Sequence, residues 1–313
     1  MSETVYLPIP PAKPQTTLPQ PELTDEQEKM RVEVQKHFED PAYFPSEEKP
    51  LMDVEKMWLS YECILRYLRA SKWKVDFCIQ RIDATLKWRR EYGIYERTAE
   101  FVEPEAVTGK EILLGSDVHG RPALYLIPSR QNTTEGTRQI QFNVWMLERC
   151  IDLMPAGVES LDLLINYADK AKNPSFSVSR TVLSILQDHY PERLGQALIL
   201  NVPWLLNTFF KLITPFIDPV TRNKMKFNPQ VIEDGIFTPD MVMKQWWGGS
   251  CDFEYEHDKY WPALVAMCSE RTKIWTETWQ ELGGKVGIKE SEYKKNSPEL
   301  RAPAATDPTA ADL

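Results

Sequence analysis

The chain has 313 residues, of which 42% are hydrophobic, 27% charged and 11% aromatic, which excludes a disordered or collagen-like chain and predicts a packed core. Lys and Arg total 37 against 46 Asp and Glu. The resulting net charge of −9 argues against the broad basic surface that nucleic-acid binding requires. Five scattered cysteines without a C-x-x-C pair, and four scattered histidines, predict neither a disulfide framework nor a zinc site.

Both ends of the chain contain many prolines, and we predict that both are disordered. Within residues 1–22, prolines recur from Pro8 to Pro21 at a spacing that suits extended polyproline conformers rather than helix or central strand. Residues 291–313 mix prolines with small and acidic side chains. The first residues lack the basic and apolar regions of a signal peptide, so we expect a cytoplasmic protein.

The folded part is predicted to be α/β, with a helical N-terminal lobe followed by a small, mainly parallel sheet flanked by helices. Residues 23–100 show apolar side chains at helical spacing, whereas residues 101–255 alternate short β-prone runs with segments long enough for crossover helices. Residues 256–290 contain a final helix, expected to pack on the N-terminal lobe. The predicted strands are 123–127, 161–167, 197–202 and 225–227; the predicted helices after residue 100 are 140–153, 179–187 and 260–279.

The most apolar helix of the sequence is predicted at residues 204–217, W-L-L-N-T-F-F-K-L-I-T-P-F-I, entered through Pro203. Its polar strip is narrow, so its apolar arc is wider than a surface helix needs to cover a core. One interpretation is a fully buried core helix; the other is a lid that covers an apolar cavity and enters lipid when open. The prolines, asparagines and lysine of residues 194–217 argue against a membrane span. The apolar lid residues are Trp204, Leu205, Phe209, Phe210, Leu212, Ile213 and Phe216.

Motifs on both sides of this segment resemble the CRAL-TRIO lipid-binding family, particularly its fungal phosphatidylinositol transfer proteins. They are Y-P-E-R-L-G at 190–195, N-x-P-W at 201–204 and P-F-I-D-P-x-T-x-x-K at 215–224, in that order. L-R-Y-L-R-A at 65–70 and K-W-R-R-E-Y-G at 87–93 resemble the family's N-terminal lobe. Blocks at 146–157 and 260–265 are similar to the subgroup linked to sterols and azole-drug resistance in yeasts. The resemblance implies the CRAL-TRIO fold, with a lid helix over an apolar cavity.

The resemblance also implies a headgroup site for phosphatidylinositol, in which a cation and donors meet the phosphodiester and a carboxylate meets the inositol hydroxyls. An alternative is that Glu192 and Lys224 form an ion pair that only fastens the ends of the lid. Ser71, followed by Lys72, stands where family members have a second arginine, so the site differs there. The implied headgroup residues are Asp117, Glu192, Thr221 and Lys224.

Four leucines align with the polar residues by which family members contact phosphatidylcholine. Burying a phosphocholine against leucines leaves polar groups unpaired, at about 1 to 3 kcal/mol per group, so we expect poor phosphatidylcholine binding. The same leucines enlarge an apolar wall that a sterol can cover, although they are equally compatible with ordinary strand-facing core positions. These residues are Leu113, Leu124, Leu161 and Leu163.

Three functions from different classes follow from these features. The first is a carrier without cofactor that binds phosphatidylinositol or sterol and docks transiently on membranes such as the endoplasmic reticulum, lipid droplets, the cell periphery or endosomes. The second is a module that presents phosphatidylinositol to a lipid kinase or membrane protein. The third, an enzyme, is disfavoured because the sequence has no G-x-S-x-G, H-E-x-x-H, Walker loop or G-x-G-x-x-G after a strand.

Overall fold

The computed structural model describes residues 4–16, 22–45, 49–134, 136–169, 176–202 and 222–295. Its first part is helical. The helix α1 starts where Thr24 accepts a hydrogen bond from the backbone of Gln27 and completes a capping box, and α3 starts where Ser60 caps Cys63. The helices of this part are α1 (Asp25–Glu39), α2 (Asp53–Trp58), α3 (Tyr61–Ala70), α4 (Val75–Glu91) and α5 (Ala99–Ala106).

A five-stranded sheet follows, with its strands in chain order across the described part of the molecule. The edge strand β1 is antiparallel to β2, and the remaining neighbours are parallel, which confirms the predicted mainly parallel α/β sheet. The strand β1 was not predicted, because its apolar run is short and ends at Gly115. The strands are β1 (Glu111–Ser116), β2 (Pro122–Leu126), β3 (Leu161–Asn166), β4 (Leu194–Leu200) and β5 (Met225–Phe227).

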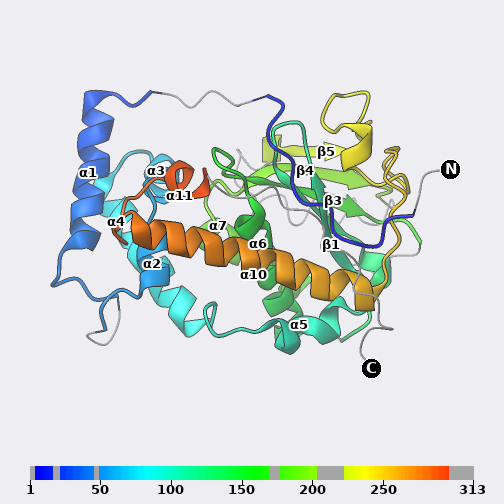
Figure 1. Cartoon of the computed structure of the whole chain (residues 1–313), viewed down its shortest axis with the longest axis horizontal. Coiled ribbons are helices and arrows are strands. Elements are labelled where there is room, and N and C mark those ends of the chain that lie inside the picture. Colours follow the sequence, from blue (N-terminus) through cyan, green and yellow to red (C-terminus); the bar gives the residue numbers. More distant parts are fainter. Residues whose placement is uncertain are drawn as a thin grey trace.

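Helices α6 (Thr137–Leu153) and α7 (Phe176–His189) connect the parallel strands. The long helix α10 (His257–Glu281) runs from the sheet to the N-terminal helices and is followed by α11 (Glu290–Lys294) (Figure 1). Near the far end of α10, Trp275 packs with Tyr293 of α11 and Met57 of α2. One helix thereby spans both halves of the molecule.

The ordered ends of the chain differ from the predicted disorder. Residues 4–16 lie against the sheet: Gly115 donates to the Ile9 carbonyl at 2.8 Å, and Gln15 donates to the Val118 carbonyl at 3.0 Å. A proline-rich segment can take this place because the outer side of β1 needs hydrogen-bond partners, and an extended chain supplies carbonyl oxygens. At the other end, residues 291–294 of α11 fall in the range 291–313 that was expected to be a disordered tail. They are ordered because Tyr293 and Lys294 are buried in tertiary contacts.

Tyr260 of α10 completes the covering of the β1 edge. Its hydroxyl accepts a hydrogen bond from the Leu113 N–H at 2.7 Å and donates one to the Leu113 carbonyl at 2.8 Å. Tyr260 is 1% exposed, so no water can replace it. A single side chain therefore satisfies both outward-facing backbone groups of Leu113.

A buried pair of acids lies where β1 turns into β2. Asp117 accepts hydrogen bonds from the backbone N–H groups of His119 and Arg121, at 2.9 and 2.8 Å, and so closes the turn. Asp162 of β3 lies beside it, with the Arg121 guanidinium 3.9 Å away. Burial and the neighbouring Asp117 carboxylate raise the pKa of Asp162 well above its usual range. The backbone of Gly195 lies so close to the Asp162 carboxylate that any side chain at position 195 would collide with it.

The edge contact makes Tyr260→Phe a sharp test of the fold. The change leaves two buried backbone groups of Leu113 without partners, at about 1 to 3 kcal/mol for each group, and should lower the free energy of unfolding accordingly. Denaturant unfolding followed by circular dichroism measures the loss. Tyr43→Phe is the matched control, since Tyr43 donates to the Asp83 carboxylate in a partly exposed position and should lose much less. Equal losses in the two variants would contradict the edge role of Tyr260.

Asp162 should make the protein less stable as the pH rises. In the unfolded chain an aspartate ionises near pH 3.9, and the raised pKa of Asp162 means that the folded protein holds this proton up to a higher pH. Above about pH 4 the unfolded state therefore binds fewer protons than the folded state does. Because unfolding then releases a proton, a rise in pH favours the unfolded state. Asp162→Asn should gain stability over the wild type between pH 5 and pH 8, as measured by denaturant midpoints. The exposed variant Glu277→Gln is the control. A gain by Asp162→Asn that stays constant from pH 5 to pH 8 would show that Asp162 is already ionised in the folded protein over this range.

Candidate functional site

Three of the four expected headgroup residues lie at one edge of the sheet. Glu192 precedes β4 and Lys224 precedes β5, so both stand at the amino-terminal ends of parallel strands. The strand β1 runs antiparallel to β2, so Asp117, which follows the end of β1, lies at the same edge. The fourth residue, Thr221, and the expected lid at 204–217 lie outside the described residues.

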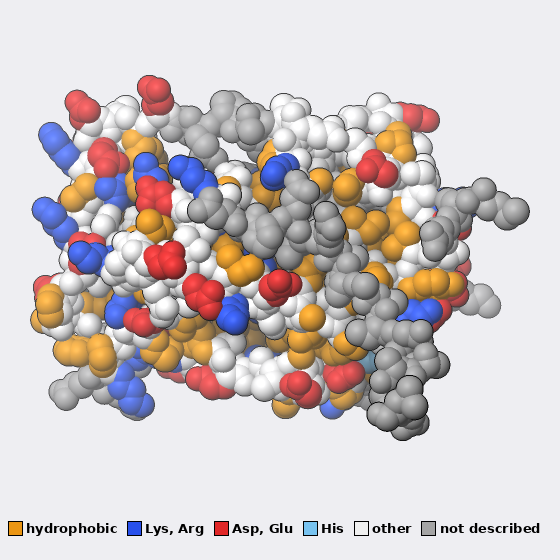
Figure 2. All heavy atoms as spheres, in the orientation of Figure 1, with side chains coloured by type: hydrophobic (Ala, Val, Ile, Leu, Met, Phe, Trp, Pro, Cys, Tyr) orange, Lys and Arg blue, Asp and Glu red, His pale blue; other side chains and the backbone are white. Residues whose placement is uncertain are grey.

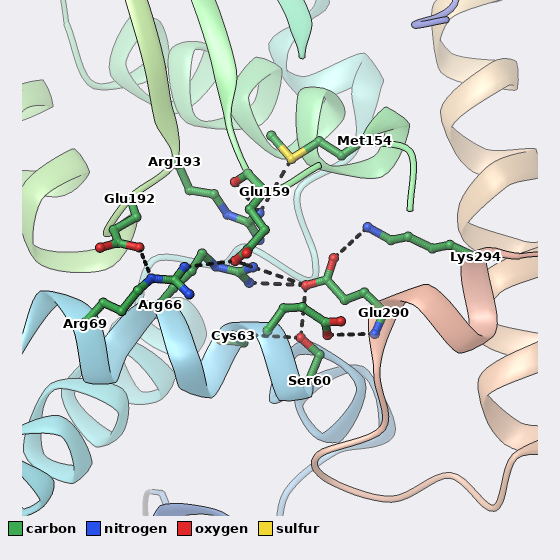
Figure 3. Close-up of polar contacts among 11 residues, drawn as sticks. Ser60, Cys63, Arg66, Arg69, Met154, Glu159, Glu192, Arg193, Glu290 and Lys294 are labelled. Atoms are coloured by element: carbon green, nitrogen blue, oxygen red, sulfur yellow. Dashed lines mark hydrogen bonds and ion pairs between the residues drawn. The ribbon is translucent and has the colours of Figure 1, made fainter. Parts of the chain in front are cut away.

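Glu192 is held by the N-terminal helices. Its backbone has a φ of +59°, a left-handed conformation that non-glycine residues adopt rarely. Its carboxylate accepts a hydrogen bond from Arg69 Nε at 2.5 Å, and Arg69 Nη2 also contacts Glu159 at 3.2 Å (Figure 3). Among the described residues, the ion-pair partner of Glu192 is thus Arg69 and not Lys224, so the alternative of an ion pair joining the lid ends is not the arrangement seen.

Lys224 contacts the beginning of the same strand. Its Nζ donates to the Leu194 carbonyl at 2.6 Å, and its own carbonyl accepts a hydrogen bond from the Ala197 N–H at 2.9 Å. Leu194 is two residues after Glu192. The start of β4 is therefore flanked by a carboxylate and an ammonium group, the two kinds of group that an inositol ring and a phosphodiester require.

Asp117 has a structural task in this arrangement. It is 5% exposed, and its carboxylate is engaged by the turn that joins β1 to β2. Its expected contact with a headgroup remains a prediction. The structure brings Asp117 to the correct edge of the sheet and shows in addition that the residue shapes the backbone there.

A buried charge cluster behind Glu192 was not predicted. Arg66 contacts Glu159 at 2.9 Å and Glu290 at 3.3 Å, while Lys294 binds the second oxygen of Glu290 at 2.7 Å (Figure 3). Arg193 donates to the Glu159 carbonyl at 2.9 Å. Arg66 and Arg69 come from the L-R-Y-L-R-A block and Arg193 from Y-P-E-R-L-G, so the motifs were visible in the sequence, whereas their meeting place was not.

The positive charges of this cluster hold the Glu290 carboxylate in its ionised form. Burial alone would raise the pKa of Glu290, but the positive charges of Lys294 and Arg66 outweigh it and lower that pKa. The cluster joins residues from α3, from the segment before β3, from the start of β4 and from α11. The Glu192 end of β4 is thus connected through Arg69, Glu159 and Arg66 to the C-terminal helix.

The four leucines expected to form an apolar wall lie on one face of the sheet. Leu113 pairs with Leu124, and Leu124 pairs with Leu163, so these three residues stand in one row across β1, β2 and β3. Leu161 lies two residues before Leu163 on β3 and shares its face. Leu163 is only partly buried, whereas the other three are buried. The row is continued by Ala197 and Met225.

On the face shown in Figure 2, acidic and basic side chains are interspersed rather than gathered into a patch of one sign. Within the described ranges, His, Cys, Asp and Glu side chains do not gather in a group able to hold a metal ion. In the same part of the chain, no helix combines the length and the hydropathy needed to cross a bilayer.

Comparisons with known proteins agree with this architecture. Residues 106–245 match the CRAL/TRIO domain model, and residues 31–84 match the model of the CRAL/TRIO N-terminal domain. The crystal structure of Sfh5 superposes with a TM-score of 0.55 at 16% identity, covering 75% of this chain and 91% of that one. This likeness supports the fold.

Two relatives match over nearly the whole chain. The phosphatidylinositol transfer protein PDR17 of Saccharomyces cerevisiae is 36% identical, with 94% of this chain and 91% of that protein covered. A CRAL-TRIO domain-containing protein of Schizosaccharomyces pombe is 47% identical over 87% of this chain, which spans only 27% of that relative's length. Together with the matched domain models, these similarities show that the chain belongs to the CRAL-TRIO family.

Proposed function

We propose that this protein is a carrier that binds phosphatidylinositol and transfers it between membranes without chemical change. The observation that carries the proposal is the placement of Glu192 and Lys224 on either side of the start of β4, at the edge where the family resemblance puts the inositol phosphate. The 36% identity to a protein named as a phosphatidylinositol transfer protein supports the same conclusion.

The chemistry of the two groups fits the proposed cargo. Lys224 supplies a cation for the phosphodiester, and Glu192 supplies acceptors for inositol hydroxyls; charge-assisted hydrogen bonds of this kind contribute about 1.5 to 3 kcal/mol each. In the present arrangement Arg69 occupies the Glu192 carboxylate. Arg69 contacts only Oε2 of Glu192, so the inositol ring can either use the second carboxylate oxygen beside Arg69 or displace Arg69.

The hydrophobic part of the cargo explains why a carrier is needed. Each methylene group removed from water is worth about 0.8 kcal/mol, so a two-chain lipid leaves a membrane very slowly unless its chains stay covered. We propose that the leucine row forms part of the cover and that the segment 204–217 is the lid that enters the membrane. Transient docking on membranes from the cytoplasm follows from this mode of action.

The leucine row also supports a preference among lipids. Leu124 and Leu163, adjacent in register, offer no hydrogen bond to a phosphocholine, whereas they suit a rigid hydrocarbon such as a sterol. We therefore propose discrimination against phosphatidylcholine and binding of sterol as a second cargo. A module that presents phosphatidylinositol to a kinase would bind the lipid equally well but would not exchange it between vesicles.

The lid proposal predicts that Phe209→Asp combined with Phe210→Asp abolishes transfer, because charged groups cannot enter the hydrocarbon of a membrane at low cost. Transfer of labelled phosphatidylinositol between vesicles measures the effect, and circular dichroism checks the fold. The conservative pair Phe209→Leu and Phe210→Leu should retain transfer. A rate unchanged by the two aspartates would reject the lid assignment.

The proposed lipid preference predicts that Leu163→Thr increases the phosphatidylcholine recovered with the protein, since the hydroxyl gives the phosphocholine a partner. Leu163→Val is the matched control, because valine has nearly the shape of threonine without its hydroxyl. Both variants are incubated with mixed vesicles, and the bound lipids are extracted and identified by mass spectrometry. Equal phosphatidylcholine in the two variants would mean that Leu163 does not face the cargo.

A further inference from the structure

A hollow of about 310 Å³ lies where Arg97 and Ala99, at the start of α5, meet α6 and α10. Arg97, Trp145 and Arg149 line it, together with Val265 and Thr272 of α10. A smaller hollow adjoins it and shares Arg97, Trp145 and Arg149. The two arginines therefore stand where the two hollows meet.

Both guanidinium groups are held in place by aromatic rings. The Arg149 guanidinium lies 4.6 Å from the Trp145 ring centroid, and that of Arg97 lies 4.8 Å from the Tyr92 ring centroid. Arg97 Nη2 donates to the Tyr92 carbonyl at 2.6 Å. Stacked and tethered in this way, a guanidinium loses little conformational freedom when it binds an anion.

Arg97 retains unused hydrogen-bonding capacity. Its Nη1 is buried and has no hydrogen-bond partner, and Arg97 forms no ion pair with a carboxylate in the described part of the chain. A buried guanidinium nitrogen without an acceptor is unfavourable, so the present conformation of Arg97 is not its best satisfied one. Arg149 uses Nε for Asp152, at 2.6 Å, which leaves the two terminal nitrogens of its fork.

The carboxylates near the hollow are already compensated. Asp152 is paired with Arg149, and burial raises the pKa of Asp152. Glu148, in the smaller hollow, accepts hydrogen bonds from Arg89 on both carboxylate oxygens, at 2.9 and 3.0 Å. Glu148 and Asp152 therefore already have arginine partners, whereas Arg97 forms no ion pair among the described residues, although the Glu96 carboxylate lies in its neighbourhood.

We propose that the hollow between α5, α6 and α10 is a binding site for a phosphate monoester, held by the guanidinium groups of Arg97 and Arg149. Arginine forks match the oxygens of a phosphate in pairs, and a monoester carries about −1.5 to −2 charge near pH 7. The ligand is either a soluble phosphate monoester or the phosphorylated headgroup of a membrane lipid. The site is independent of the proposed lipid cargo, since none of its residues belongs to the leucine row or the Glu192 edge.

The test uses the full chain and inorganic phosphate, phosphoserine, and phosphatidylcholine vesicles with or without a phosphoinositide monophosphate. Calorimetry measures binding of the soluble probes, and co-sedimentation measures binding to vesicles. Arg97→Gln should weaken binding at least tenfold, and Arg149→Lys should weaken it several-fold, because lysine keeps the charge but lacks the fork. Lys273→Gln is the matched control: it removes one charge from α10 at an exposed position next to Thr272 and should bind as the wild type does.

Saturable binding of the soluble probes that depends on Arg97 supports the site, and co-sedimentation that requires both the phosphoinositide and Arg97 supports it with a lipid headgroup as the ligand. Thermal unfolding of each variant checks that it is folded. If Arg97→Gln is unstable, Arg149→Lys still tests the site, because lysine can keep the ion pair with Asp152. The proposal is overturned if the wild type binds none of the probes, or if Arg97→Gln and Arg149→Lys bind as well as Lys273→Gln does. When the vesicles contain no phosphoinositide monophosphate, all variants should transfer phosphatidylinositol between them at the same rate.

Discussion

Compensation of one buried carboxylate, that of Glu290, holds together segments that lie far apart in the sequence. The Glu290 carboxylate forms ion pairs with Arg66 of the N-terminal helices and with Lys294 of its own helix. It also accepts a hydrogen bond from the Ser60 hydroxyl at 2.9 Å. A buried charge that lost these partners would be strongly unfavourable, by about 3 to 5 kcal/mol for a broken pair. The C-terminal helix is therefore fixed against the N-terminal lobe at a defined position, and Arg66 is fixed against Glu159 beside the sheet.

The same network reaches the region that we assign to the lipid headgroup. Glu159 joins Arg66 to Arg69, and Arg69 holds Glu192 at the start of β4. Glu192 is thus positioned by side chains of the N-terminal helices rather than by its own strand alone, which explains how a residue with an unfavourable backbone conformation keeps a single place. The N-terminal lobe has a direct part in building the site.

Periodicity and motif order were sufficient to predict much of this protein. The helical spacing of residues 23–100, the apolar runs of β2 to β4 and the blocks around Y-P-E-R-L-G indicated an α/β protein of the CRAL-TRIO family, and the sheet and the comparisons confirm both. The strand β1 was missed because Gly115 interrupts its short pattern. The proline-rich arm was predicted to be disordered because its partner, the outer side of β1, cannot be recognised before that strand is known.

Local sequence determined which segments become helix or strand, because capping side chains, apolar spacing and proline act on residues close to them in the chain. Tertiary structure decided which side chains meet: that Leu113, Leu124 and Leu163 form one row, that Glu192 binds Arg69, and that Arg97 and Arg149 share a hollow. These contacts depend on strand register and on burial, which join residues far apart in the sequence. A single sequence shows the charges and their motifs, while the fold determines which of them are compensated and which remain available to a ligand.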